Sequence, residues 1–141
     1  MEARLASDPL PAGRPTILVA DPSEAVRNSV GAFLRAHDYT VETCASGRAL
    51  LEAVRSRPPD CLVMEMDLPG ITGLDLLARL ADLEVPLPVI VLSTESDPHV
   101  AARVVEAGVL DLLGKPFSGR ALLAGIERAL RSHAPANPHR E

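Results

Sequence analysis

The chain has 141 residues, of which 47% are apolar and 23% charged, which suits one folded domain with a buried core. Only 2% of the residues are aromatic, and the net charge is −5, which argues against binding nucleic acid by stacking or by neutralising phosphates. No apolar run approaches the roughly 20 residues that a membrane helix needs, and residues 1–14 lack the apolar segment of a signal peptide. We therefore expect a cytoplasmic protein that binds neither nucleic acid nor membranes.

The predicted elements alternate along the chain in a rhythm of apolar strand, turn and amphipathic helix. Residues 1–14, rich in proline, are expected to form a flexible arm, and residues 134–141 a flexible tail, so the folded domain should span 15–133. Strands are predicted at 17–20, 39–44, 61–64, 89–92 and 109–113, and each is followed by a helix whose apolar residues recur every three or four positions.

Helix boundaries carry their own signals. Ser46 and Ser118 are expected to cap the second and fifth helices, while Pro98 opens the fourth and Gly108 ends it. Asp21, followed by Pro22 and then Glu24, has the pattern of an N-cap with a capping box, so Asp21 alone has an ordinary structural explanation.

Three of the strands, 17–20, 61–64 and 89–92, are unbroken apolar runs, as burial on both faces of a parallel sheet requires. Because right-handed crossovers place helices on both sides of such a sheet, the pattern predicts a doubly wound α/β fold of five strands and five helices. Ligands of such folds bind outside the carboxyl ends of the strands.

Polar side chains gather at these predicted strand ends. They are Asp21, Glu65, Asp67, Ser93 and Lys115, which together could hold a divalent cation and an oxyanion. Taken singly, Asp67 suits a turn, Ser93 could bond to nearby backbone, and Lys115 could be a solvated loop lysine. Their joint occurrence at one edge favours a functional site.

Four segments carry a resemblance to a known family: ILVAD at the first strand, EMDLPGITGLDLL after the third, VIVLSTES at the fourth and GKPF after the fifth. Over about residues 16–133 the chain resembles the receiver domain of two-component response regulators, the CheY-like fold, and especially the FixJ-type receivers. The resemblance implies the strand order 2-1-3-4-5 and a role in phosphorelay signal transduction.

In that family a sensor histidine kinase phosphorylates an aspartate at the end of the third strand, with Mg²⁺ bound beside it. By resemblance, Asp21 matches the first metal-binding acid and Asp67 the residue that offers its carbonyl to the metal. Ser93 matches the switch hydroxyl, Lys115 the lysine that binds the phosphoryl oxygens, and Pro116 a proline preceded by a cis peptide bond.

Four positions depart from the family pattern. Pro22 stands in place of the second acid, and Glu65 in place of the phosphorylated aspartate. Thr94 replaces the small residue beside the switch hydroxyl, and Leu112 replaces the switch aromatic. The loss of one carboxylate weakens the negative field that attracts Mg²⁺, so we expect no cofactor. Mg²⁺ would bind only if the site is still functional.

Glu65 is one methylene longer than aspartate, which displaces its carboxylate from the position for in-line transfer. We therefore predict an atypical receiver, a pseudo-receiver that signals by protein contact without phosphorylation. Glu65 either pairs with Lys115, with or without a bond to Ser93, and holds one conformation, or it points to solvent in a decayed site.

Two other functions remain open from the sequence. The chain could be a working receiver that accepts phosphate at Glu65 or Asp67, or, more remotely, a metal-dependent phosphohydrolase. The leading interpretation is not an enzyme.

With no output domain expected after residue 133, output should pass to a histidine kinase or a downstream protein. The family resemblance implies that the contact face is the fourth helix, fifth strand and fifth helix (Arg103, Val105, Leu112, Arg120), through which a homodimer could also form. Cys44 and Cys61 should lie two strand spacings apart, too far for a disulfide.

Overall fold

The computed structural model describes residues 13–94 and 96–132. The tail expected over 134–141 and all but the last two residues of the arm expected over 1–14 lie outside this described part.

The described residues form a parallel five-stranded sheet and five helices. The strands are β1 (Thr16–Ala20), β2 (Thr40–Cys44), β3 (Cys61–Glu65), β6 (Val89–Ser93) and β7 (Asp111–Gly114), and the helices are α1 (Glu24–Ala36), α2 (Gly47–Ser56), α3 (Gly73–Asp82), α4 (Pro98–Glu106) and α5 (Gly119–Ser132). The strands lie in the order β2-β1-β3-β6-β7, which is the predicted 2-1-3-4-5 arrangement. The doubly wound α/β fold is therefore confirmed.

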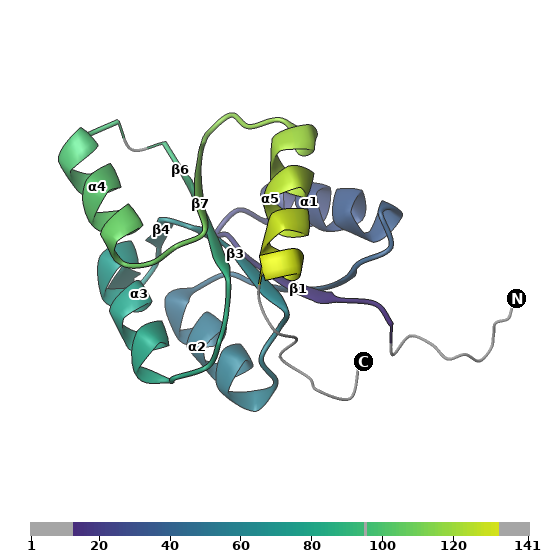
Figure 1. The fold of residues 1–141 in the computed structure, drawn as a ribbon, viewed down its shortest axis with the longest axis horizontal. Helices are drawn as coiled ribbons and strands as arrows, with labels where there is room; N and C mark the ends of the chain where they lie inside the picture. Colours follow the sequence, from purple (N-terminus) through teal and green to yellow (C-terminus); the bar gives the residue numbers. More distant parts are fainter. Residues whose placement is uncertain (1–12, 95, 133–141) are drawn as a thin grey trace, which may run out of the picture.

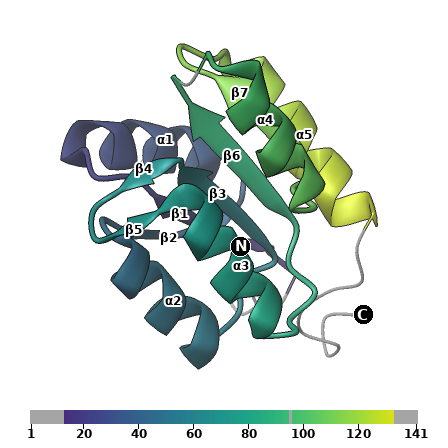
Figure 2. The same ribbon diagram turned by 90° about the vertical axis from the view of Figure 1, so that its left-hand side faces the viewer.

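The structure contains a small hairpin that the sequence pattern does not predict. Two strands of two residues, β4 (Asp67–Leu68) and β5 (Ile71–Thr72), pair antiparallel around a turn in which Gly70 has a φ of +91°. Figure 2 shows this hairpin between the end of β3 and the start of α3. Its pairing is too short to leave a period-two signal in the sequence.

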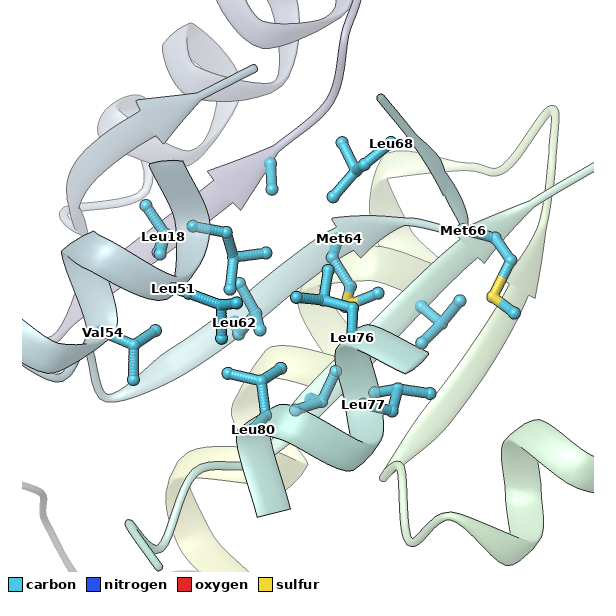
Figure 3. Packing of buried hydrophobic residues seen from close by; sticks show 14 of the residues in the cluster. Leu18, Leu51, Val54, Leu62, Met64, Met66, Leu68, Leu76, Leu77 and Leu80 are labelled. Atoms are coloured by element: carbon cyan, nitrogen blue, oxygen red, sulfur yellow. The ribbon is translucent and has the colours of Figure 1, made fainter. Parts of the chain in front are cut away.

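Helices cover both faces of the sheet (Figure 1). On one face, β1 and β3 pack Leu18, Leu62 and Met64 against α2 and α3, as Figure 3 shows. On the other face, α1 and α5 pack against Ile17, Val63 and the neighbouring strand residues. β3 is buried along its whole length, which explains its unbroken apolar sequence.

The structure confirms several helix caps and corrects one. The Ser46 and Ser118 hydroxyls accept backbone N–H bonds at the starts of α2 and α5, and Pro98 opens α4. The prediction that Asp21 caps α1 is wrong, because Ser23 is the N-cap and its hydroxyl accepts the N–H of Val26. Asp21 lies at the end of β1 instead, which leaves its carboxylate for another role.

Six strand boundaries also differ from the predictions by one or two residues. β1 begins at Thr16 rather than at residue 17, and β2 begins at Thr40 rather than at residue 39. β3 continues to Glu65 and β6 to Ser93, while β7 runs from Asp111 to Gly114 rather than over 109–113. In β7 the difference has a local cause, because Gly108 turns the chain with a φ of +91° and the next two residues complete the return to the sheet.

Both cysteine thiols are free, as predicted. Cys44 ends β2 and Cys61 begins β3, with β1 between the two strands. In the described part of the chain, none of the helices combines the length and the apolar character needed to cross a bilayer.

Candidate functional site

Four strand ends bring the predicted polar residues together at one edge of the sheet. Asp21 follows β1, Glu65 ends β3, Ser93 ends β6, and Lys115 follows β7. Asp21, Glu65 and Ser93 are all buried, with at most 6% of their surface exposed. Buried polar groups require partners, so their contacts define what this edge can do.

Lys115 lies between the two acids. Its Nζ donates to Asp21 Oδ2 at 3.0 Å and also to Glu65 Oε1 in a short contact. The Lys115 side chain is 21% exposed, whereas the carboxylates are 2% and 8% exposed, so both ion pairs are largely removed from water. Glu65 therefore points inward at Lys115, and the alternatives of a solvent-facing Glu65 and a solvated Lys115 are wrong.

The remaining carboxylate oxygens are bound as well. Asp21 Oδ1 accepts the N–H of Ser23 at 2.9 Å, and Glu65 Oε2 accepts the N–H of Asp67 at 3.2 Å. Each of the four carboxylate oxygens thus accepts a hydrogen bond from the chain itself. We call the three side chains Asp21, Glu65 and Lys115 the acid–lysine cluster.

Backbone contacts fix the lysine in place. The Lys115 N–H donates to the carbonyl of Ser93 at 2.9 Å, which ties the end of β7 to the end of β6. The Lys115–Pro116 peptide bond is cis, the isomer that the family resemblance implies.

The charges of the acid–lysine cluster favour a protonated lysine. Burial lowers the pKa of Lys115, but hydrogen bonds from its ammonium to Glu65 and Asp21, and the negative charges of those two groups, outweigh burial and raise the pKa above its usual 10.5. The cluster therefore holds two carboxylates and one ammonium at neutral pH, a local charge of about −1.

The residues present do not fit a Mg²⁺ ion. This ion needs oxygen ligands in near-octahedral geometry, usually including one or two carboxylates. Both buried carboxylates, those of Asp21 and Glu65, are occupied by the ammonium, and Pro22 offers no side-chain oxygen. Within residues 13–94 and 96–132, no group of three or more His, Cys, Asp or Glu side chains is arranged to hold a metal ion.

The other predicted site residues take peripheral places. Pro22, Asp67 and Thr94 are exposed around the cluster. Leu112 pairs with Val91 in the sheet and is half-buried against the core under α2, α3 and α4.

Arg27 was missed by the sequence reasoning. Its Nη1 donates to the carbonyls of Asp21 and Pro22 at 2.9 and 3.0 Å, which fixes the loop that presents Asp21. A cation near the start of a helix opposes the helix dipole, and this unfavourable placement was a signal that the residue has another partner.

The fold and the site together define a doubly wound α/β protein with an acid–lysine cluster at the carboxyl edge of its sheet. Residues 17–127 match the family model described as "Response regulator receiver domain". The chain belongs to the response regulator receiver domain family.

Curated relatives agree with this assignment. The chain is 31% identical over 120 residues to the transcriptional regulatory protein FixJ of Bradyrhizobium diazoefficiens, a match covering 85% of this chain and 58% of that protein. It is 34% identical over 119 residues to the response regulator MprA of Mycolicibacterium vanbaalenii, covering 84% and 52%. The chain thus spans about half the length of these relatives.

Solved structures share the architecture. The chemotaxis response regulator CheY4 of Vibrio cholerae superimposes with a TM-score of 0.74 at 28% identity, covering 83% of this chain and 99% of that one. The signal receiver domain of an HD domain-containing protein from Pseudomonas fluorescens gives a TM-score of 0.78 at 27% identity, covering 84% and 95%. The CheY-like fold and the place in two-component signalling are therefore shown.

Proposed function

We propose that this receiver works without phosphorylation, as a pseudo-receiver whose conformation is held by the acid–lysine cluster. The observation that carries the proposal is the contact of Glu65 with Lys115, the lysine that by resemblance would bind a phosphoryl oxygen. The Glu65 carboxylate supplies negative oxygens to the ammonium from within the chain, and such charge-assisted bonds contribute about 1.5–3 kcal/mol.

Three further features support the proposal. Both oxygens of Glu65 are already bound, so attack on an incoming phosphoryl group would first break the bond to Lys115 or to Asp67. The Mg²⁺ ion that neutralises developing charge in phosphoryl transfer has no fitting ligand set here. Leu112 lacks the ring and polar tip of the switch aromatic, so it cannot reproduce the movement by which that aromatic signals the phosphorylated state in the family.

The proposal is tested by incubating the chain with acetyl phosphate and Mg²⁺ and measuring its intact mass. We expect no phosphorylated species. A gain of one phosphoryl group, mapped by peptide sequencing to Glu65 or Asp67, would favour a working acceptor and overturn the proposal. An assay of phosphate release from a phosphate monoester should likewise show no turnover, because the chain is proposed to be non-enzymatic.

Output is proposed to pass by protein contact through α4, β7 and α5, in the cytoplasm, to a histidine kinase, a downstream protein or a second copy of the chain. On α4, Val105 is 59% exposed, an unusual state for a large apolar side chain. If copies associate through this face, Val105→Asp will lower the association constant measured by analytical ultracentrifugation. The matched change Ala78→Asp, on the exposed side of α3, will leave it unchanged.

A further inference from the structure

A hollow of about 860 Å³ opens between α1 and the loop that joins β7 to α5. Small-molecule sites typically have volumes of about 300–1,000 Å³ with apolar walls and a few polar groups. This hollow, which we call the α1 hollow, has walls of Val26, Val30, Phe33, Pro116 and Phe117. Its volume and its mainly apolar lining therefore fall within the range of small-molecule sites.

Aromatic side chains are concentrated at the α1 hollow. The chain has two phenylalanines, and both line it, half-buried and on opposite segments. Gly119 permits this arrangement, because a Cβ there would lie 2.6 Å from Phe33 Cζ. Two half-buried rings offer apolar area that a bound ring system would cover.

Lys115 also lines the α1 hollow, together with the exposed residues Ser29 and Thr94. An ammonium has three N–H groups, and those of Lys115 make two bonds, to Glu65 and Asp21. Among residues 13–94 and 96–132 these are its two side-chain partners, which leaves one N–H to donate to a ligand. Because the acid–lysine cluster carries a charge of about −1, it repels an anionic group and favours an uncharged acceptor.

We propose that the α1 hollow binds an uncharged ring-containing small molecule that carries a carbonyl-type acceptor. Its rings lie against Phe33 and Phe117, and its acceptor takes the third N–H of Lys115. Such a ligand bridges α1 and the β7–α5 loop beside the acid–lysine cluster. This proposal depends on the geometry of the hollow, so its failure would leave the proposed absence of phosphorylation unaffected.

The first experiment titrates the unmodified chain with two probes of the same ring system, 2-acetonaphthone, a ketone, and 2-naphthoate, its carboxylate counterpart. We expect 2-acetonaphthone to cause saturable shifts of amide NMR signals from α1 and residues 115–119. We expect 2-naphthoate to bind at least about tenfold more weakly, a difference of about 1.4 kcal/mol. Equal binding of both probes, or shifts centred elsewhere, would overturn the proposal.

A pair of variants tests the location. Ser29 lines the α1 hollow and Asn28 does not, although both are exposed on α1. Ser29→Phe should fill the space and weaken 2-acetonaphthone binding at least about tenfold, whereas Asn28→Phe should leave it unchanged. Equal effects of the two variants count against the site. If 2-acetonaphthone gives no saturable shift up to its solubility limit, the small-molecule proposal fails, and an apolar side chain of a protein partner becomes the better occupant.

Discussion

At the scale of single residues, the lysine between two acids is the feature on which the site depends. Asp21 and Glu65 are buried acids whose negative charges are compensated by Lys115. Removing one partner of a buried ion pair leaves an uncompensated charge, which costs far more than breaking an exposed pair. The acid–lysine cluster should therefore contribute to stability as well as to signalling.

Lys115→Met is expected to lower the free energy of unfolding by about 3 kcal/mol, the lower end of the range for broken buried pairs because Lys115 is partly exposed. Urea denaturation at neutral pH measures this loss. Arg48→Met is the matched control, since it breaks the exposed Arg48–Glu52 pair and should cost under about 0.5 kcal/mol. Equal losses in the two variants would show that Lys115 does not compensate the charges of Asp21 and Glu65 as described.

The cysteines give a pH dependence with a definite sign. Burial raises the pKa of the Cys44 thiol to about 11 and that of the Cys61 thiol to about 12. Since these pKa values are raised on folding, their contribution to stability is complete below pH 9 and is lost as the pH rises towards 11–12.

The free energy of unfolding should therefore fall with pH above 9. Cys61→Ala should make the decline between about pH 9.5 and 11 shallower by up to about 1.4 kcal/mol per pH unit, because one titrating thiol is removed. Urea denaturation over this pH range measures both slopes. An unchanged slope would mean that Cys61 ionises as readily in the folded chain as in the unfolded one.

At the scale of elements, the start of α3 is a tight junction near the site. Gly73 is its first residue, and a Cβ there would lie 2.6 Å from Met66 Sδ and 2.7 Å from the Met66 carbonyl oxygen. A backbone atom cannot move aside as a side chain can, so the path from β3 through the hairpin to α3 requires glycine at this position.

Gly73→Ala is expected to destabilise the fold by about 1–3 kcal/mol, as overpacking typically does. Gly114→Ala provides the comparison, because nothing lies within 4 Å of its added Cβ, and its effect should stay within about 0.5 kcal/mol. Thermal or urea unfolding of both variants tests the difference. If Gly114→Ala proves the more costly, the close approach at Met66 does not limit this junction.

At the scale of the whole molecule, the acid–lysine cluster joins residues at the ends of β1, β3 and β7, three strands of one sheet. A ligand that binds only the folded chain raises its stability, so unfolding reports metal binding directly. The cluster already contains a cation, the Lys115 ammonium, so the wild-type chain should not bind Mg²⁺ there.

Mg²⁺ is accordingly expected to leave the unfolding free energy of the wild-type chain unchanged at constant ionic strength. The double variant Pro22→Asp/Glu65→Asp restores two short acids and should be stabilised by about 1.4 kcal/mol at a Mg²⁺ concentration about ten times its dissociation constant. The same variant should gain a phosphoryl group from acetyl phosphate. Stabilisation of the wild type to the same extent would contradict the ligand analysis.

Alternating buried strands and amphipathic helices sufficed to predict the parallel sheet, its helices and the edge where Asp21, Glu65, Ser93 and Lys115 meet. These features follow from local periodicity and from the few topologies that parallel strands permit. The strand order and the departures at Pro22 and Glu65 came from the family resemblance. The cap at Ser23 lay within reach of the sequence, but the competing pattern at Asp21 concealed it.

Contacts between residues far apart in the chain needed the tertiary structure. Whether Glu65 faced Lys115, 50 positions away, or solvent depended on side-chain directions and burial that no local pattern encodes. The α1 hollow likewise exists only because α1 and the β7–α5 loop, distant in sequence, meet in space. Local sequence fixes backbone conformation and apolar periodicity, whereas partner choice among charged groups depends on which strands end side by side.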